Sequence, residues 1–448
     1  MKVAFVNLGY TNALFQPPLN LCYLASYVRK YAKHKYEFII IDETMGDNVE
    51  KKLKEFKPDI VGVTALTTTS QRAFDIAKFC KRINAVSIIG GIHATVCKDT
   101  ILNESEFDIA VIGEGEQTFL EILEGEDLED IDGIIFRRGS EIVHTPKREL
   151  IKDIDIIPIP ARDLIDMEKY ISKRDIHQKY RITNMITTRG CPYNCIYCSV
   201  NRIAGGFVRF NSVEHVKREI DDLKKYNVEA IYFSDDTFTM NMPRLTEICN
   251  YLKDNDIKFY CMGRANQVNE EMLTMLKNSG CVEIAFGFES MSPKILEHLK
   301  KGTVTVEQNR NAVKLCKKVG LPLQAFFMIG SPYETREDIK MTFDFADEEG
   351  LIPAFFITTP FIGTELYDWC KENNLIPDKV DWSKAFLDYR VSLSASNVLT
   401  KEEIREIFLG LLGKYYKKIT TFELIKKFML RPKFSIPLIK DYIKLKCE

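Results

Sequence analysis

The sequence has almost no net charge, no long hydrophobic run, and no low-complexity segment or short repeat. Its 62 lysines and arginines are balanced by 64 aspartates and glutamates, so the formal charge is only −2 over 448 residues. That balance argues against a nucleic-acid-binding protein that works through an overall basic field. No run of about 18 apolar residues occurs, and we therefore expect no transmembrane helix. A content of 45% hydrophobic and 28% charged residues excludes a mainly disordered chain.

An export signal is also lacking. The first ten residues, MKVAFVNLGY, contain neither the long apolar core nor the small-residue cleavage site of a signal peptide, and they are predicted to form a strand instead. The twelve cysteines are consequently not expected to form the disulfide framework of a secreted protein. We expect a cytoplasmic protein in which some of the thiols have chemical roles.

Residues 1–140 are predicted to form a Rossmann-like α/β domain. Short apolar runs at 2–8, 37–42, 59–66, 85–89 and 107–112 alternate with helical patterns such as 19–35 and 70–81, which is typical of a parallel sheet. The strands are apolar throughout, as expected when helices cover both faces of the sheet. A ligand of such a sheet binds beyond the carboxyl ends of its strands.

The turns after three of these strands are small, hydroxylated or rich in glycine. They comprise Thr67, Thr68, Thr69 and Ser70 after the third strand, Gly90, Gly91, Ile92 and His93 after the fourth, and Gly113, Glu114, Gly115 and Glu116 after the fifth. Turns of this kind let backbone N–H groups approach a bulky or phosphorylated ligand. Ordinary connections between strand and helix remain the alternative for each of them.

A second α/β region is predicted after a connector at 141–180, in which Pro158 and Pro160 favour extended backbone. Between residues 181 and 375, six apolar strands at 182–187, 230–233, 258–262, 283–287, 324–329 and 354–358 alternate with helical patterns. Six such units predict a partial (β/α)6 barrel of the TIM type, with its chemistry at the carboxyl ends of the strands.

Residues 376–448 are predicted to form a C-terminal helical domain. Its last part, 411–448, carries ten lysines and arginines and three acidic residues, with aromatic residues between them. A basic amphipathic segment of this kind is either a helical cap with a solvated face or a contact for a membrane surface or an acidic partner.

Three cysteines, Cys191, Cys195 and Cys198, directly follow the first strand of the second region. Thiolates at C-x3-C-x2-C spacing on one loop can bind three irons of a [4Fe-4S] cluster and leave the fourth iron open to a substrate. A structural zinc site needs a fourth ligand. No such ligand lies nearby in the sequence, although folding could recruit His177 or Cys261.

The cysteine motif resembles the C-x3-C-x-aromatic-C signature of the radical S-adenosylmethionine (SAM) superfamily. The resemblance implies that the three cysteines hold a [4Fe-4S] cluster, that its open iron chelates SAM, and that Tyr197 lies beside the adenine. It also implies that residues 234–236 bind the methionine amino group of SAM. Many family members have Gly-Gly-Glu at these positions, whereas this sequence has Ser-Asp-Asp. The SAM contacts implied by these and later family motifs are Ser234, Asp235, Asp236, Arg264, Glu289, Ser290, Gly330 and Glu334.

The first domain is similar to the cobalamin-binding domain of cobalamin-dependent radical SAM enzymes. The cobalamin contacts implied by this resemblance are Pro17, Leu19, Thr67, Thr68, Thr69, Ser70, Gly90, Gly91, His93, Gly113, Glu114, Gly115 and Glu116. The Asp-x-His-x-x-Gly motif that places a histidine under cobalt in methionine-synthase-like proteins is absent; the run at 175–180 lies in the connector and lacks the glycine. His93 is better placed, and a structural role at a helix start is equally compatible with its position.

The resemblance implies a cobalamin-dependent radical SAM methyltransferase. A ferredoxin or flavodoxin would reduce the cluster, SAM would be cleaved to a 5′-deoxyadenosyl radical, and an unactivated carbon would lose hydrogen and be methylated from methylcobalamin. Such chemistry requires no general base, and we nominate none. An oxidoreductase, cyclase or rearrangement enzyme with the same cofactors is the alternative. Relatives act on peptides, antibiotic precursors, tetrapyrroles and lipids, and the basic tail favours a lipid or protein partner.

Two other classes are disfavoured. A methylthiotransferase needs three further cysteines for a second cluster, and Cys22, Cys80 and Cys97 are poorly placed for that role. A binding or sensing protein without catalysis is disfavoured because a cluster with an open iron is costly to keep in air.

Overall fold

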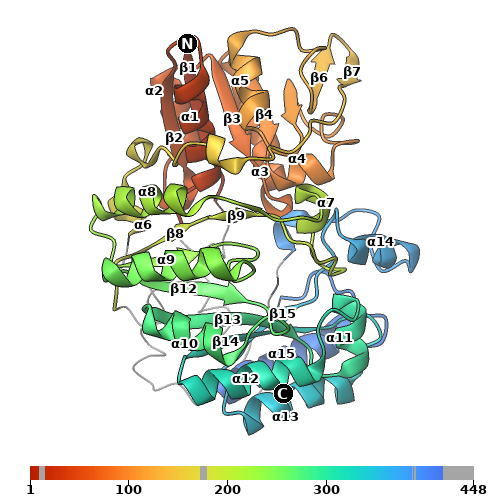
Figure 1. The fold of residues 1–448 in the computed structure, drawn as a ribbon. Helices are drawn as coiled ribbons and strands as arrows, with labels where there is room; N and C mark the ends of the chain where they lie inside the picture. The colour runs from red at the N-terminus through yellow and green to blue at the C-terminus, as the bar shows by residue number, and fades with distance from the viewer. Residues whose placement is uncertain (10–15, 172–178, 386, 388–389, 417–448) are drawn as a thin grey trace. The chain divides into compact units, whose positions relative to one another are not determined.

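The computed structural model describes residues 1–9, 16–171, 179–385, 387 and 390–416 (Figure 1). Their contacts divide the chain into two compact units, one comprising 1–194, 199–263 and 269–284, and the other comprising 195–198, 264–268 and 285–448. This division differs from the four-part organisation expected from the sequence, whose boundaries stay predictions. Within the described ranges, no helix combines the length and the apolarity that a membrane crossing requires.

The first region contains a seven-stranded sheet of order β2-β1-β3-β4-β5-β6-β7. The five predicted strands are confirmed as β1 (Lys2–Asn7), β2 (Glu37–Asp42), β3 (Ile60–Thr64), β4 (Val86–Gly90) and β5 (Ile109–Val111), and they are parallel. An antiparallel hairpin of β6 (Ile134–Arg138) and β7 (Glu141–His144) extends the sheet. This hairpin was not predicted from the sequence, and β7 lies in the range predicted to be a connector.

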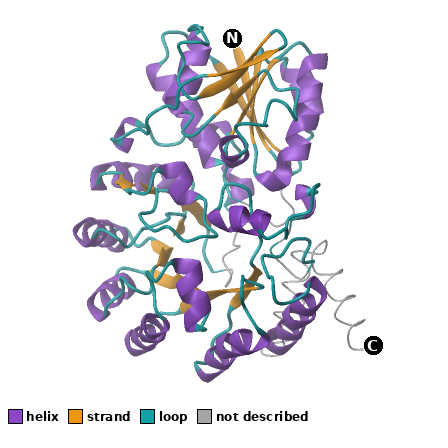
Figure 2. Ribbon diagram, turned by 90° about the vertical axis from the view of Figure 1, so that its right-hand side faces the viewer, coloured by secondary structure: helices purple, strands orange, loops and turns teal. Residues whose placement is uncertain are grey.

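Helices flank this sheet on both sides (Figure 2). They are α1 (Leu19–Tyr31), α2 (Val49–Phe56), α3 (Ser70–Arg82), α4 (Ile92–Val96) and α5 (Glu116–Glu124). Apolar residues of α1 and α5 pack on the buried strands around Phe5, which is why these strands carry no polar face. The order reverses between β1 and β3, so a ligand crevice is expected at their carboxyl ends. Because β3, β4 and β5 are adjacent and parallel, the three turns singled out above lie along one edge of the sheet.

The connector is a packed segment and not a loose linker. It contains short 3₁₀ helices at Ile154–Ile156 and Arg162–Leu164 and the helix α6 (Met167–Tyr170). The hydroxyl of Tyr170 donates to Asp42 Oδ2 at 2.7 Å, at the carboxyl end of β2. Ile154 and Ile157 pack against Leu19 and two tyrosines of α1.

The six predicted strands of the second region are confirmed, in the order β15-β14-β13-β12-β11-β8. They are β8 (Ile182–Met185), β11 (Ala230–Phe233), β12 (Lys258–Gly263), β13 (Cys281–Glu289), β14 (Leu323–Ile329) and β15 (Ala354–Ile357). The intervening helices are α8 (Val213–Lys224), α9 (Met242–Asp254), α10 (Glu270–Asn278), α11 (Pro293–Lys300), α12 (Val306–Val319) and α13 (Arg336–Glu348). Most begin at a side chain that accepts a hydrogen bond from the first turn, as Ser212 and Thr305 do. This architecture is a partial (β/α)6 barrel.

The prediction of helices throughout 376–448 is wrong for the described residues of 376–400. After α14 (Glu365–Glu372), these residues form a 3₁₀ turn at Trp382–Lys384 and otherwise loop. Ser394 and Ser396 accept hydrogen bonds from nearby backbone N–H groups, which stabilises the loop in competition with a helix. The loop lies along β15, where Ile357 N–H donates to Leu387 O at 2.9 Å and Ala395 N–H to Thr358 O at 3.0 Å.

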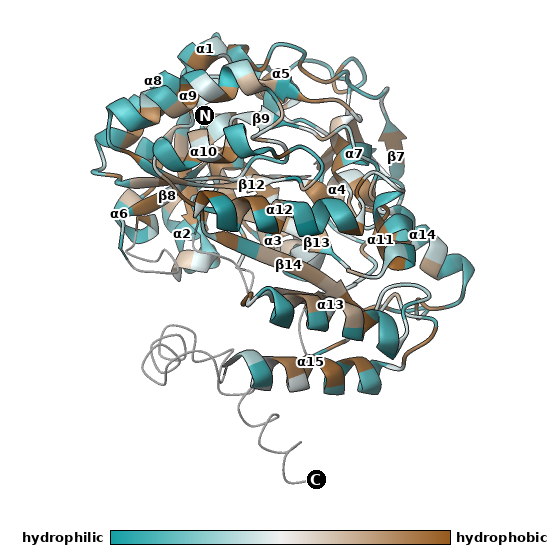
Figure 3. Cartoon of the chain, turned by 60° about the horizontal axis from the view of Figure 1, so that its bottom comes forward, coloured by the Kyte–Doolittle hydropathy of each residue, from teal (hydrophilic) through white to brown (hydrophobic). Residues whose placement is uncertain are grey.

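The final described helix, α15 (Lys401–Tyr416), alternates apolar and polar residues along its length (Figure 3). Its apolar residues Ile404, Phe408 and Tyr415 are buried, and the Tyr415 ring lies 5.9 Å from that of Phe355 in β15. This part of the tail therefore caps the core of its unit. Nearly all of the basic stretch lies in 417–448, outside the described residues.

Candidate functional site

A short antiparallel ribbon closes the base of the cysteine-bearing loop. It pairs β9 (Thr188–Arg189) with β10 (Arg209–Phe210), so that the loop runs from 190 to 208, and Arg189 stands directly opposite Arg209. Gly190 has a φ of +94°, and a Cβ at this position would lie 2.3 Å from the backbone oxygen of Phe207. Only glycine fits where the chain leaves β9 and reaches the first cysteine.

The three cysteines differ in exposure: Cys195 is buried, whereas Cys191 and Cys198 are half-buried. Between them, Ile196 anchors the loop, since its N–H donates to Leu299 O at 3.0 Å and its carbonyl accepts from Leu366 N–H at 2.8 Å. The helix α7 (Val200–Ala204) follows the last cysteine.

The cysteines fit a [4Fe-4S] cluster through their donor chemistry. Arg264 Nη1 lies 3.9 Å from Cys195 Sγ, so a cationic group stands beside one of the three sulfur atoms. Among the residues that the structure describes, no three or more histidine, cysteine or acidic side chains are already arranged to hold a metal ion. Of the two ligands considered for a zinc site, His177 lies outside the described residues and Cys261 is buried in β12.

The two aspartates after β11 have different surroundings. Asp235 is buried and accepts hydrogen bonds from the N–H groups of Thr187 and Thr188, at 2.5 and 2.7 Å, and from the Thr187 hydroxyl at 2.6 Å. Burial raises the pKa of Asp235 to about 6, although these hydrogen bonds oppose the shift. Asp236 is exposed and accepts from the N–H of Gly190, beside the first cysteine.

A hydrogen-bonded network joins three of the predicted SAM contacts. The Tyr197 hydroxyl donates to Glu289 Oε1 at 2.8 Å, and Lys300 Nζ lies 3.2 Å from the same oxygen. Arg264 Nη2 donates to the hydroxyl of Thr303 at 2.5 Å, and that hydroxyl donates in turn to Lys300 O. The structure thus brings Tyr197, Arg264 and Glu289 together and adds Lys300 and Thr303, which no sequence motif indicated.

The remaining predicted SAM contacts lie in separate turns. Ser290 is fully buried, and its hydroxyl oxygen accepts from Ser292 N–H at 3.1 Å. Glu334 is also fully buried; its Oε2 accepts from Gly330 N–H at 2.7 Å and Ser331 N–H at 3.0 Å. Burial raises the pKa of Glu334 to about 8, and its Oε1 has no hydrogen-bond partner within the described part of the chain. The buried hydroxyl of Ser234 has none there either.

In the first domain, the turns after β3 and β4 are tightly packed and hydrogen-bonded. The 3₁₀ turn Thr67–Thr69 is held by its own hydroxyls, with Leu66 N–H donating to Thr69 Oγ1 at 3.0 Å and Ser70 Oγ donating to Thr67 O at 2.9 Å. Gly91 has a φ of +90°, and a Cβ there would lie 2.8 Å from Thr64 Oγ1. Leu66 and Ile92 are 44% and 43% exposed, so two aliphatic side chains face outward at this edge of the sheet.

The His93 ring is buried and its side chain does not face solvent. Only 2% of the residue is exposed, Nδ1 lies 3.5 Å from Cys97 Sγ, and burial lowers the pKa of His93 to about 4. Nε2 has no partner among the residues that the structure describes. These surroundings correspond to the structural role that the sequence left open. Pro17 and Leu19 are likewise buried, at the start of α1.

Glu114 and Glu116 meet arginines of the ribbon. Glu114 Oε1 accepts from Arg189 at 3.0 Å and Oε2 from Arg209 at 2.8 Å, while Glu116 Oε1 accepts from Arg189 at 2.6 Å. Burial alone would raise the pKa of Glu114, but the two guanidiniums lower it, so the carboxylate is charged. Neither arginine was singled out from the sequence, although Arg189 stands two residues before Cys191.

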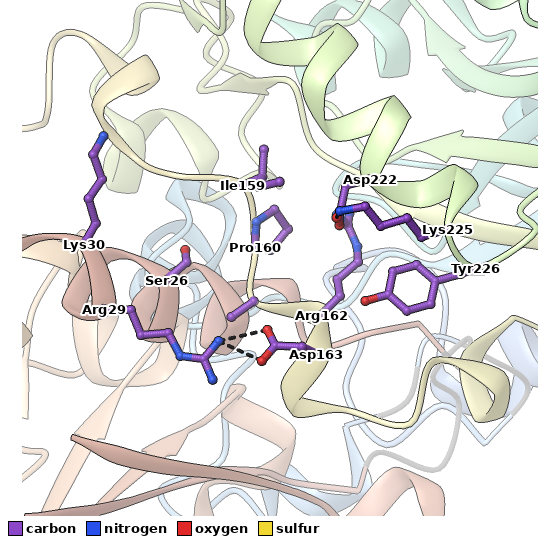
Figure 4. A pocket seen from close by; sticks show the side chains of 11 residues that line it. Ser26, Arg29, Lys30, Ile159, Pro160, Arg162, Asp163, Asp222, Lys225 and Tyr226 are labelled. Carbon is purple, nitrogen blue, oxygen red and sulfur yellow. Dashed lines mark hydrogen bonds and ion pairs between the residues drawn. The ribbon is translucent and has the colours of Figure 1, made fainter. Parts of the chain in front are cut away.

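A surface cavity of about 510 Å³ is lined by residues outside all of these turns (Figure 4). Its walls come from α1, the connector and α8, and the Arg29 guanidinium is paired there with Asp163. The residues that line it are Ser26, Arg29, Lys30, Ile159, Pro160, Ala161, Arg162, Asp163, Asp222, Lys225 and Tyr226. None of them is a predicted site residue.

Family models match both regions of the chain. The radical SAM superfamily model matches residues 185–346, and the B12 binding domain model matches residues 9–123. Among solved structures, the radical SAM methyltransferase TsrM from Kitasatospora setae, with cobalamin and a [4Fe-4S] cluster bound, aligns with a TM-score of 0.73 at 16% identity. The alignment covers 94% of this chain and 89% of that chain, which shows a shared fold.

Sequence relatives cover most of the chain. The uncharacterized methyltransferase PH0819 of Pyrococcus horikoshii is 38% identical over 82% of this chain and 81% of its own length. An anaerobic magnesium-protoporphyrin IX monomethyl ester cyclase of Cereibacter sphaeroides is 26% identical over 94% and 71%. A putative methylthiotransferase of Methanocaldococcus jannaschii is 31% identical over 68% of each chain. The chain therefore belongs to the radical SAM superfamily, among the members that carry a B12-binding domain ahead of the radical SAM domain.

Proposed function

We propose that the protein is a cobalamin-dependent radical SAM methyltransferase that acts on an unactivated carbon. The observation that carries the proposal is one chain with a three-cysteine loop behind the first strand of a partial barrel and a B12-binding domain ahead of it. When bound, the [4Fe-4S] cluster and cobalamin supply the cleavage of SAM and the methyl group. The protein's own residues bind and orient these groups and exclude water.

We assign Cys191, Cys195 and Cys198 to the cluster. Asp236 is assigned to the methionine amino group of SAM in preference to Asp235, whose two carboxylate oxygens already accept three hydrogen bonds from Thr187 and Thr188. Asp236 is exposed beside the start of the cysteine loop, where a carboxylate can meet an ammonium group. The hydroxyl oxygen of Ser234, which has no partner within the described residues, is a second acceptor at the same turn.

Other SAM contacts are assigned to the network around Glu289. The hydrogen bond from Tyr197 fixes the aromatic ring of the cysteine motif, which we place beside the adenine. Lys300 holds the Glu289 carboxylate, which we assign to the ribose. Glu334 stabilises the turn at Gly330, because its carboxyl group accepts hydrogen bonds from two backbone N–H groups of that turn.

Cobalamin is assigned to the carboxyl edge of β3, β4 and β5. The backbone of the turns at 67–70, 90–93 and 113–116 supplies N–H groups, and the exposed side chains of Leu66 and Ile92 supply an apolar surface for the corrin ring. Within the described residues, no histidine side chain of these turns reaches the surface, because the His93 ring is buried.

Radical SAM enzymes need an external electron donor, and we propose a ferredoxin or flavodoxin for this one. For the substrate we propose an organic, lipid or protein molecule whose binding involves the basic C-terminal tail. Flotation with liposomes tests the lipid version by comparing the full chain with one cut near residue 410. Equal binding of the two proteins would contradict it.

The test of the function uses anaerobic protein loaded with iron, sulfide and hydroxocobalamin. About four irons and one cobalt per chain are expected, with Cys195→Ala losing iron and the matched control Cys80→Ala keeping it, because Cys80 is a buried thiol of α3. Methyl transfer would give S-adenosylhomocysteine and 5′-deoxyadenosine in equal amounts. Iron without cobalt in the wild type would overturn the proposal.

A cyclase or another radical oxidoreductase is the second candidate. The observation that favours it is the 26% identity to the magnesium-protoporphyrin cyclase over 94% of the chain. Formation of 5′-deoxyadenosine without S-adenosylhomocysteine would select this alternative.

A further inference from the structure

The carboxylate of Glu114 lies between the two ends of the cysteine loop. Arg189 and Arg209 are paired across β9 and β10, and like charges directly opposite each other on a ribbon repel. Glu114 binds one arginine with each of its oxygens, at 3.0 and 2.8 Å. It thereby converts a repulsive pair into a bridge that closes the loop at its base.

The bridge is largely buried, and both oxygens of the Glu114 carboxylate are hydrogen-bonded, while Arg209 Nε has no partner among the described residues. The Glu114 side chain is 16% exposed, that of Arg209 4% and that of Arg189 22%. Glu114 Oε2 also accepts from Ile151 N–H at 3.1 Å, and Glu116 adds a second carboxylate to Arg189 at 2.6 Å. Little capacity remains on the Glu114 carboxylate for a further ligand.

Both carboxylates belong to the turn after β5, where α5 begins. This turn is one of the three that line the carboxyl edge of the first sheet. Its Gly113 N–H already donates to Thr95 Oγ1 at 3.0 Å, which leaves the backbone after Gly113 to meet a ligand. One turn can therefore contact a ligand with its backbone and the cysteine loop with its side chains.

We propose that Glu114 is a positioning residue that ties the cobalamin-binding turn to the base of the cluster loop, so that occupancy of the turn stabilises the loop. The proposal rests on the proposed function for the identity of the two ligands. In this proposal the Glu114 carboxylate binds the two arginines, and the backbone of the same turn contacts cobalamin.

The first experiment needs neither cofactor. Iron-free wild-type protein and Glu114→Gln are treated with trypsin, and cleavage after Arg202, inside the loop, is followed by mass spectrometry. We expect cleavage to be at least tenfold faster in E114Q, because the amide cannot neutralise two opposed arginines. Equal rates would overturn the proposal.

A matched control is Glu121→Gln on the same domain. Glu121 lies in α5, pairs with Arg148 through two hydrogen bonds and is 16% exposed, but it does not touch the ribbon. E121Q should lose thermal stability comparably and leave cleavage at Arg202 unchanged. If E121Q accelerates that cleavage as much as E114Q, the effect is general loosening and the proposal fails.

The second experiment follows release of iron from reconstituted protein to a chelator, with and without hydroxocobalamin. Cobalamin should slow release in the wild type at least fivefold and have no such effect in E114Q, with the cobalamin affinity of E114Q unchanged within threefold. Weaker cobalamin binding with unaltered iron release would make Glu114 a cobalamin ligand and refute the positioning role. Wild-type protein that takes up no iron would contradict the proposed function, while the trypsin result would still decide the role of Glu114.

Discussion

The ion pair of Arg162 and Glu219 yields a quantitative prediction about how the connector is held. Arg162 Nη2 lies 2.6 Å from Glu219 Oε1, and the two side chains are 0% and 1% exposed. The Tyr23 hydroxyl donates to the other oxygen of Glu219 at 3.3 Å. Glu219→Gln preserves the shape of the side chain but leaves a buried guanidinium without a counter-charge.

Removing one partner of a buried ion pair costs about 3–5 kcal/mol, whereas an exposed pair contributes about 0.2–1 kcal/mol. The matched control is Asp163→Asn, next to Arg162 in sequence. Asp163 accepts from Arg29 at 2.8 and 2.9 Å, but these two side chains are 62% and 40% exposed (Figure 4). For a cooperative unit of 150–250 residues, a loss of 1 kcal/mol lowers the melting temperature by about 2–4 °C. We expect a decrease of roughly 6–20 °C for E219Q and at most about 4 °C for D163N.

The assay is thermal unfolding of the iron-free protein, followed by circular dichroism at one pH and one protein concentration. The double variant Arg162→Met with Glu219→Leu removes both charges and should recover most of the loss, because no unpaired charge stays buried. Equal decreases for E219Q and D163N would refute the reasoning. So would a double variant no more stable than E219Q.

Three further predictions concern the site. Gly190→Ala should destabilise the cysteine loop and lower iron uptake, because the added Cβ would meet a backbone oxygen. The control is Gly302→Ala, since Gly302 also has a positive φ (+68°) but its Cβ would meet no other atom. Equal iron content in the two variants would contradict the prediction. Asp235→Asn should lower the free energy of unfolding in urea by less than about 1 kcal/mol. The amide oxygen still accepts from both N–H groups, and the amide NH2 donates to the Thr187 hydroxyl. Asp235→Leu, which removes these hydrogen bonds, should lower it by about 3 kcal/mol. Glu334 has a pKa of about 8 in the folded protein and an ordinary one in the unfolded chain, so the folded state keeps this proton up to a higher pH. Relative to Glu334→Gln, wild-type stability should therefore fall by about 1.4 kcal/mol per unit as pH rises from 5 to 8, and parallel melting curves would refute this.

The strands could be predicted because each is an apolar run between turn residues. The hairpin of β6 and β7 was missed although Ile134, Ile135 and Phe136 form such a run, since its second strand is short and half-exposed. The loop positions of Leu387 and Ala395 escaped prediction for another reason: their backbone hydrogen bonds go to Ile357 and Thr358, which a local pattern cannot reveal.

Site residues can be predicted where a sequence motif indicates the chemistry. They cannot be predicted where a role depends on contacts between residues far apart in the sequence. Spacing alone predicts the three cysteines as cluster ligands, and that assignment stays a prediction. Spacing could not choose between Asp235 and Asp236, because the proposed choice depends on which carboxylate accepts from the backbone of Thr187 and Thr188. Glu114 was singled out as part of a turn, but its arginine partners lie 75 and 95 residues further along the chain.

The loop along β15 has a consequence for association between molecules. β15 ends the six-stranded sheet, and an uncovered last strand offers unpaired N–H and carbonyl groups to any other strand it meets. The hydrogen bonds to Leu387 and from Ala395 occupy some of these groups within the same chain. Leu387 and Ala395 thus cover part of this edge, and a truncated protein that ends before residue 387 would leave it open to pairing with a strand of another molecule.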